Sequence, residues 1–194
     1  MNNFWKNIWD SKGKSGSDDL LFLDGYEHLK IKFSSKEIVT QILGHLDATP
    51  PGTILEVGCG AGFLAREMQD FHYTGIDYSV PIIEKHKILF PHHEVYVLEA
   101  SKLSFESFSY DWVFCFGLFQ YLENYEYAER VISEMKRVAK KGIFIGDLKT
   151  KPTRKEHFVY SMNKLISENF KISECLYDSN DVERFNAYYK MEAL

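Results

Sequence analysis

Cysteine is scarce in this sequence of 194 residues, which contains only Cys59, Cys115 and Cys175. The number is odd and no two of them form a Cys-x-x-Cys pair, so the pattern supports neither a disulfide framework nor a zinc site. We therefore expect no bound metal ion and a reducing, cytoplasmic environment.

Long apolar runs are missing as well. The longest extends from Trp112 to Phe119, whereas a membrane-spanning helix needs about 20 apolar residues. The N-terminal segment MNNFWKNIWD lacks the basic start and the apolar stretch of a secretory signal. We expect a protein that is not exported and has no membrane partner.

An excess of positive charge is also absent. The chain has 23 Lys and Arg residues against 28 Asp and Glu residues, which gives a formal net charge of -5. A chain of this charge gains little from releasing the counterions of a polyanion. We therefore expect no nucleic-acid partner.

The remaining composition is typical of one folded domain, with 45% hydrophobic and 26% charged residues. The aromatic share of 15%, which includes 15 Phe and 12 Tyr, is high. Aromatic side chains in this number either fill a core or line a pocket, and composition does not distinguish the two.

From Thr53 onward, short apolar runs alternate with helical patterns, which indicates a parallel α/β sheet. The expected strands are 53–58, 72–77, 93–98, 110–116 and 142–147. The expected helices are 61–70, 80–90, 124–140 and 155–168. The last two β-rich runs, 170–177 and 184–192, should form an antiparallel pair at the sheet edge.

The first 50 residues differ in character from the remainder. FWKNIWD predicts a short aromatic helix, the Gly- and Ser-rich segment 11–19 a mobile loop, and 35–46 a helix that ends before Pro50-Pro51-Gly52. We expect residues 1–50 to form a small helical cap, not a separate domain, on a cofactor-binding domain of residues 51–194.

The segment ILEVGCGAGFLA, residues 54–65, joins an apolar strand to a turn with three alternating glycines, Gly58, Gly60 and Gly62. Glycines in such a turn let the backbone pass close to a ligand bound outside the carboxyl end of the first strand. A lone glycine loop is weak evidence for a particular ligand.

Two acidic residues make the pattern more specific. Glu56 lies inside the first strand, where a pyrophosphate-binding loop would have no use for a carboxylate. Asp77 ends the second strand, nineteen residues after Gly58, which is the spacing of a carboxylate that accepts both hydroxyls of a ribose.

Together these residues resemble the class I S-adenosylmethionine-dependent methyltransferases, and more closely their small-molecule branch. Segment 56–62 is similar to the first motif of the family, Asp77 to its ribose-binding acid, and Tyr78 to the residue that packs on the adenine. LEAS at 98–101 is similar to the segment that reads the adenine edge, although Asp is commoner in the family where this chain has Glu99.

The resemblance implies an α/β fold with a Rossmann-like, doubly wound seven-stranded sheet, mostly parallel with an antiparallel last strand, plus the N-terminal cap. It implies S-adenosylmethionine as the cofactor. FCFGLFQYL at 114–122 resembles the segment beneath the methionine moiety. The cofactor-binding residues expected from the resemblance are Glu56, Gly58, Cys59, Gly60, Gly62, Asp77, Tyr78, Glu99, Ala100, Ser101 and Phe116.

The segments that mark DNA-base, catechol-type and protein-arginine methyltransferases are not evident in this chain. The expected activity is therefore metal-independent methyl transfer, by in-line displacement, onto an oxygen, nitrogen or carboxyl group of a small molecule. Two alternatives stay open, namely a non-catalytic S-adenosylmethionine-binding or regulatory protein and an NAD-dependent oxidoreductase, although GCGAGF lacks the GxGxxG spacing of the latter.

Loops over the strand ends and the cap supply the candidates for substrate contact, including Lys149. A general base would help only a hydroxyl acceptor, and the weak candidates for catalysis are Tyr121, Asp147, His28 and His157. The candidates for a lid or for substrate binding are Trp5, Trp9, Tyr26, Gln120 and Tyr121. No motif identifies the acceptor or the oligomeric state.

Overall fold

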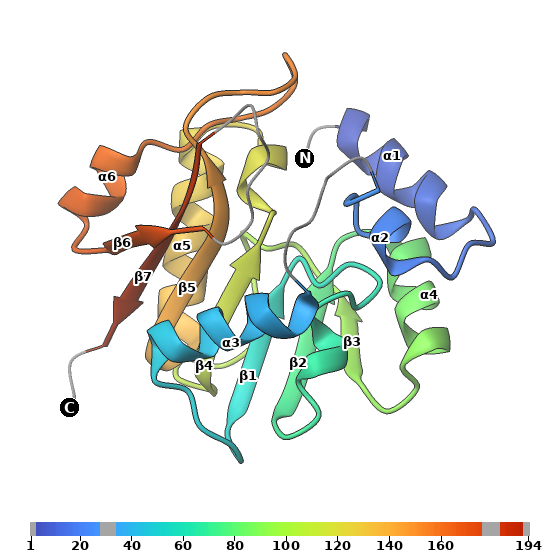
Figure 1. The fold of residues 1–194 in the computed structure, drawn as a ribbon, viewed down its shortest axis with the longest axis horizontal. Helices are drawn as coiled ribbons and strands as arrows, with labels where there is room; N and C mark the ends of the chain where they lie inside the picture. The colour runs from blue at the N-terminus through green and yellow to red at the C-terminus, as the bar shows by residue number, and fades with distance from the viewer. Residues whose placement is uncertain (1–2, 28–33, 176–182, 192–194) are drawn as a thin grey trace.

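The computed structural model describes residues 3–27, 34–175 and 183–191 (Figure 1). Seven strands in this part of the chain form one sheet in the order β3-β2-β1-β4-β5-β7-β6. The first five strands pair in parallel, whereas β7 pairs antiparallel with both β5 and β6, which confirms the expected Rossmann-like sheet. The strands are β1 (Thr53–Val57), β2 (His72–Asp77), β3 (Glu94–Val97), β4 (Tyr110–Phe116), β5 (Ala139–Lys149), β6 (Lys171–Glu174) and β7 (Arg184–Lys190).

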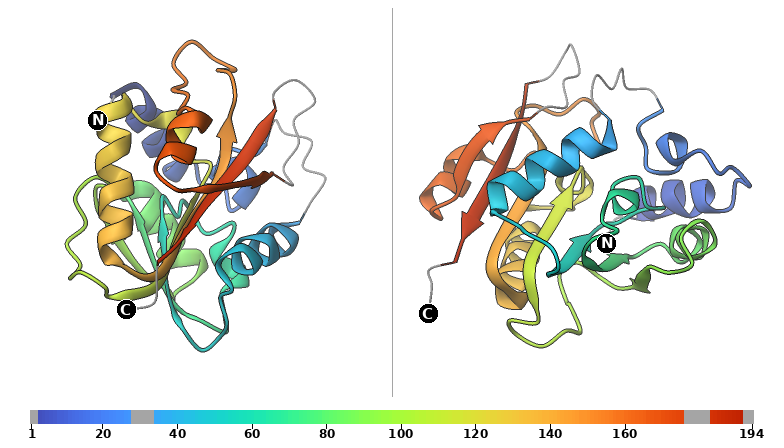
Figure 2. Two further views of the ribbon diagram at one scale, coloured as in Figure 1. Left: turned by 90° about the vertical axis from the view of Figure 1, so that its left-hand side faces the viewer. Right: turned by 60° about the horizontal axis from the view of Figure 1, so that its bottom comes forward.

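Helices cover both faces of the sheet (Figures 1 and 2). α3 (Ser35–Leu46) and α4 (Val80–Leu89) contribute buried side chains to the core on one face. α5 (Tyr125–Val138) and α6 (Met162–Ser167) do so on the other face. The sheet therefore has the three-layer arrangement in which apolar surface is removed from water on both sides.

The residues of β4 show how one strand serves both cores. Val113 and Cys115 belong to the core beneath α5, whereas Trp112, Phe114 and Phe116 belong to the core beneath α3. Successive side chains of a strand point to opposite faces, so a strand buried on both sides has a continuous apolar sequence. This is why YDWVFCF predicts a central strand.

The N-terminal residues form α1 (Asn3–Gly13) and α2 (Leu20–Leu23), which lie together beside α4 (Figure 1). The Ser79 hydroxyl at the start of α4 donates to a carboxylate oxygen of Asp10 on α1 over 2.7 Å. α1 is longer than expected, so only residues 14–19 of the expected loop lie outside it, and α2 was not expected. The division of the chain at residue 50 stays a prediction.

The expectation of a helix over 61–70 is wrong. The segment contains only the 3-10 helix η1 (Ala65–Glu67). Gly60 and Gly62 have positive φ angles, which no right-handed helix contains, and the chain must reach β2 a few residues later. The apolar residues after the glycines are buried in a compact turn instead of along a helix face.

The helix expected over 155–168 is also too long, because α6 begins only at Met162. The Phe158 N–H donates to the Gln120 carbonyl, 2.9 Å away in the 3-10 helix η2 (Phe119–Tyr121). This long-range bond holds the chain extended beside η2, where an α-helical residue would donate to its own helix.

β5 continues past the expected end at residue 147, to Lys149. Its pairing with β7 is irregular between Ile145 and Leu148, and Asp147 in that interval has a φ angle of +59°. An irregularity of this kind bends a strand, and here it lies near the carboxyl end of β5. Within the described ranges, none of the helices has the length and apolar character that crossing a membrane requires.

Candidate functional site

A cavity of about 680 Å³ lies at the carboxyl ends of β1, β2, β4 and β5. The direction of chain connection reverses between β1 and β4, and open α/β sheets bind their ligands at this point. α1 and the turn after α2 form the opposite wall. The volume is within the range of about 300–1,000 Å³ typical of small-molecule sites.

The glycine loop after β1 is tied to the neighbouring strand. The Gly58 and Cys59 N–H groups both donate to the Ile76 carbonyl of β2, over 2.8 and 2.9 Å. Gly58 and Gly60 line the cavity with φ angles of +78° and +54°, a region that residues with a Cβ atom rarely adopt. At these two positions the loop therefore presents backbone to the cavity, without a side chain of its own.

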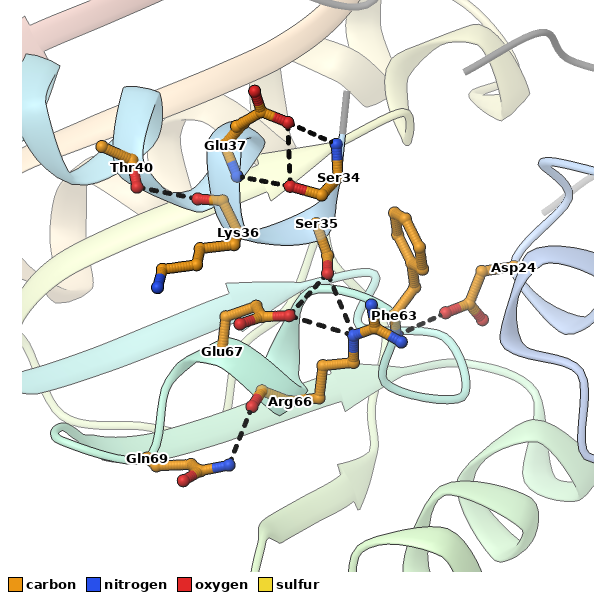
Figure 3. A network of polar contacts seen from close by, with 10 residues as sticks. All are labelled: Asp24, Ser34, Ser35, Lys36, Glu37, Thr40, Phe63, Arg66, Glu67 and Gln69. Carbon is orange, nitrogen blue, oxygen red and sulfur yellow. Dashed lines mark hydrogen bonds and ion pairs between the residues drawn. The ribbon is translucent and has the colours of Figure 1, made fainter. Parts of the chain in front are cut away.

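Asp24, in the turn after α2, enters this loop from the cap (Figure 3). Its two carboxylate oxygens accept hydrogen bonds from the Ala61 and Phe63 N–H groups over 2.6 and 2.8 Å. A Cβ atom at position 60 would lie 2.2 Å from Asp24 Oδ1, so only glycine fits there. Sequence reasoning missed Asp24, because its partners are 37 and 39 residues away and no local motif marks it.

Three carboxyl groups, those of Asp24, Glu56 and Asp77, share this side of the cavity. Burial raises the pKa of Asp24 to about 7 and that of Asp77 to about 6. Burial also raises the pKa of Glu56 well above its usual value, and the charges of the other two carboxylates add to the effect. A bound cation would relieve this repulsion, so the site suits a positively charged ligand.

Two of these carboxyl groups are held by specific donors. The Tyr73 hydroxyl donates to Glu56 over 2.7 Å, and the Ser79 N–H donates to Asp77 over 2.9 Å. The Gly60 N–H approaches the second Asp77 oxygen at 3.4 Å, so Asp77 connects the end of β2 with the glycine loop.

A second, smaller cavity adjoins the first and shares Gly58, Asp77 and Tyr78 with it. Of the LEAS segment, Leu98 and Ala100 line this cavity. Glu99 instead accepts a hydrogen bond from the Tyr127 hydroxyl over 2.6 Å, and Tyr127 itself lines the cavity. Tyr127 is not among the site residues expected from the sequence.

The side of the large cavity towards β4 and β5 is lined by aromatic side chains. The Trp5 ring stacks on His157 with centroids 5.2 Å apart, and Trp9 packs edge-on against Tyr121 at 5.1 Å. Tyr26 lines the same cavity and packs on Phe63. His28, a candidate from the sequence, lies outside the described residues.

Gln120 is held by one hydrogen bond and lacks another. Its Nε2 donates to the Gly117 carbonyl over 3.1 Å, which fixes the orientation of the amide. Its Oε1 is buried and has no hydrogen-bond partner in the described part of the chain. Because Gln120 lines the cavity, this oxygen can accept a hydrogen bond from a ligand.

Charged residues complete this side. Asp147 forms an ion pair with Arg184, and both side chains are almost completely buried. Burial raises the Asp147 pKa despite the guanidinium group. Lys149 Nζ donates to Thr153 Oγ1 over 2.8 Å and to His157 Nδ1 over 3.2 Å. Burial and the nearby cations together lower the His157 pKa to about 4, so the ring is neutral at pH 7.

The structure thus brings most residues expected from the sequence around one cavity. From the cofactor set, it places Glu56, Gly58, Cys59, Gly60, Asp77, Tyr78 and Phe116 in the large cavity and Ala100 in the small one. Gly62, Glu99 and Ser101 line neither. From the substrate set, the large cavity is lined by Trp5, Trp9, Tyr26, Gln120, Tyr121, Asp147 and His157. The roles of these residues stay predictions.

Residues 54–142 match a family model described as a methyltransferase domain. These residues are similar to methyltransferase domains, and the sheet described above has the fold of the class I methyltransferases. The methyltransferase family uses S-adenosylmethionine as its cofactor, and the match favours this cofactor over the NAD of the alternative oxidoreductase. A search of curated proteins finds no match to the chain.

Solved structures of methyltransferases have the same fold. Magnesium protoporphyrin IX methyltransferase from Synechocystis PCC 6803 with bound SAH superposes with a TM-score of 0.70, at 14% identity over 98% of this chain and 99% of that one. N-methyltransferase NodS from Bradyrhizobium japonicum WM9 gives 0.66, at 18% identity over 80% and 94%. Phosphoethanolamine N-methyltransferase 1 from Haemonchus contortus gives 0.68, at 16% identity over 97% and 48%.

The residues of the methyltransferase site fit this cofactor. S-adenosylmethionine carries a sulfonium and an ammonium group, and the glycine-loop side of the cavity carries three buried carboxyl groups that repel one another. Asp77 and Glu56 would hold donor groups of the cofactor, and Gly58 would allow its close approach.

The Asp24 contact leads to a prediction for stability. Asp24→Ala leaves two buried N–H groups without their acceptor and should lower the free energy of unfolding by about 1–3 kcal/mol. Urea denaturation measures the change. Asp18→Ala, which removes an exposed carboxylate of the same segment, should change it by less than about 0.5 kcal/mol. Equal effects of the two variants would contradict the role of Asp24.

The raised pKa values of Asp24 and Asp77 predict two opposite pH dependences. Both groups are more acidic in the unfolded chain, so their contribution to stability is present at low pH and is lost as the pH rises through about 6 and about 7. A cationic cofactor binds the ionised carboxylates, so its affinity should rise over the same interval. Calorimetry with S-adenosylmethionine at constant ionic strength measures the affinity at each pH, and melting curves of the free protein measure the stability. An affinity that does not change between pH 5.5 and 7.5 would contradict the prediction.

Proposed function

We propose that this methyltransferase acts on a small-molecule acceptor and needs no bound metal ion. The observation that carries the proposal is the cavity of about 680 Å³, which joins the glycine loop and its carboxyl groups to an aromatic compartment behind α1. A volume of this size supports an acceptor that is a small molecule.

The two parts of the cavity support different roles. Asp77, Glu56 and the glycine loop would hold the cofactor, with its adenine towards Tyr78 and Ala100. When bound, S-adenosylmethionine supplies a methyl group on a positively charged sulfur, so the protein has to align the acceptor and exclude water. Trp5, Trp9 and Tyr121 provide an apolar wall for that purpose.

The donor set on the acceptor side supports metal-independent transfer. Asp147, the acid after the fifth strand, is already paired with Arg184 and has Lys149 nearby, so a cation placed there would be repelled. Among the described residues, no three His, Cys, Asp or Glu side chains are arranged to hold a metal ion. Cys59 offers no thiolate either, since burial raises its pKa well above the usual value.

The candidates for a general base differ in what their surroundings allow. His157 is neutral at pH 7, but its Nδ1 is in contact with Lys149 and Thr153. Burial raises the pKa of the Tyr121 hydroxyl, which keeps it protonated, and the Asp147 carboxylate is paired. Alignment of the acceptor, to which the buried Oε1 of Gln120 can contribute a hydrogen bond, is therefore the main contribution of the protein.

Asp77→Ala tests the cofactor assignment. We expect S-adenosylmethionine, and not NADH, to raise the melting temperature of the wild type. The variant should bind the cofactor about ten to a hundred times more weakly, because a charge-assisted acceptor of the buried site is lost. Asp70→Ala, an exposed acid after η1, serves as the control and should not change the affinity.

The same protein then serves in an acceptor screen that follows S-adenosylhomocysteine release from hydroxyl, amine and carboxylate compounds, with and without a chelator. Release that stops with the chelator would contradict metal independence. Cofactor binding without release from any small acceptor would contradict the proposed substrate class.

The aromatic side of α1 gives a further test. Trp5→Ala combined with Trp9→Ala removes the wall against Tyr121 and His157 and should weaken cofactor binding if α1 acts as a lid. Asn7→Ala, an exposed position on the same helix, is the control. Unchanged affinity of the double variant by calorimetry would show that the two tryptophans serve only packing.

A further inference from the structure

One end of the large cavity is lined by cations. Lys149 stands at the end of β5, Arg154 in the segment that follows, and Arg184 at the start of β7. The carboxyl groups of Asp24 and Glu56 line the glycine-loop side of the same cavity. The cavity therefore has sides of opposite charge.

Lys149 is buried, and no carboxylate among the described residues is in contact with its ammonium group. Only 6% of its surface is exposed, and its Nζ contacts are a hydroxyl, that of Thr153, and an imidazole, that of His157. In the part of the chain that the structure describes, no carboxylate forms an ion pair with it. Burial, together with the charges of Arg184 and Arg154, lowers the pKa of Lys149 to about 8, although the Asp147 charge acts in the opposite direction. A buried cation in this setting is unfavourable until an anion compensates it.

Asp147 does not supply that compensation, because its carboxylate pairs with Arg184. His157 adds no negative charge. Arg154, which lies on the exposed rim of the cavity, adds a further positive charge. Among the described residues that line this end, Lys149, Arg154 and Arg184 are cations and Asp147 is the one carboxylate, so this part of the lining has a net positive charge. The excess lies beside an open volume, where a ligand can reach it.

An unpartnered acceptor in the wall of this compartment also supports a polar ligand. Gln120 Oε1 is buried in the wall of the cavity without a donor among the described residues. An orphaned buried acceptor is unfavourable unless a ligand or water supplies an N–H or O–H group.

We propose that Lys149 and Arg154, supported by Arg184, bind an anionic group of the methyl acceptor, either a carboxylate or a phosphate. The inference rests on the proposed function, since it assigns the acceptor to this compartment. It narrows the substrate class to small anions. Charge-assisted hydrogen bonds from Lys and Arg to such groups are short and strong, and the aromatic wall excludes competing water.

The test uses the full chain saturated with S-adenosylhomocysteine, titrated by calorimetry at matched ionic strength with inorganic phosphate, malonate and malonamide. Malonamide has nearly the shape of malonate without its charge. We expect phosphate or malonate to bind, the stronger of the two identifying the anion type, and malonamide not to bind. Arg154→Gln and Lys149→Met should each weaken anion binding at least tenfold. Lys155→Gln, an exposed neighbour outside the cavity, should leave it unchanged.

The outcomes separate the inference from the proposed function. If wild-type protein does not bind S-adenosylhomocysteine, the proposed function itself fails. If it binds S-adenosylhomocysteine but neither anion, or if malonamide and malonate bind equally, the inference is overturned. If Arg154→Gln and Lys149→Met weaken S-adenosylhomocysteine binding as much as anion binding, the cations serve the cofactor carboxylate, which also overturns it. Arg154 is exposed, so its variant should fold even if the buried Lys149 variant does not.

Discussion

The arrangement of the whole site depends on how the Asp24 carboxylate fits into the glycine loop. The loop turns through Gly60 and Gly62 with positive φ angles, and its N–H groups at Ala61 and Phe63 would be buried without partners if Asp24 were withdrawn. One side chain therefore satisfies the loop and attaches the cap to the sheet. The hydrogen bond from Ser79 to Asp10 adds a second attachment, so α1 is held as a wall of the cavity.

Local patterns predicted the central strands well because β1, β4 and β5 are buried along most of their length and are rich in apolar residues. The same method was wrong for residues 61–70 and for the start of α6. In the first case the positive φ angles of the glycines exclude a helix, and in the second the Phe158 N–H bonds to the distant Gln120 carbonyl. Both causes act through backbone geometry or long-range contact, which a helical spacing of apolar residues does not record.

The sequence predicted those residues of the candidate site that belong to a local motif. Glu56, Asp77 and the glycines stand at fixed spacings along the chain, so their place at the end of β1 and β2 follows from the strand order. Asp24 and Arg184 contact partners more than 35 residues away, and no motif marks either one. A buried carboxylate in a glycine loop and a buried ion pair are properties of the folded arrangement, not of any segment.

The separation of charge in the cavity follows from the topology of the sheet. β1 and β2, which carry Glu56 and Asp77, lie on one side of β4, whereas β5 and β7, which supply Lys149 and Arg184, lie on the other. In the proposed reaction a cationic cofactor and an anionic acceptor would each find its own side, and each would be repelled from the opposite one. On each side of the cavity, repulsion between like charges raises the free energy of the protein without ligand. Ligands of opposite charge offset that free energy when they bind. A small domain can in this way orient two ligands in one cavity without a separate substrate domain.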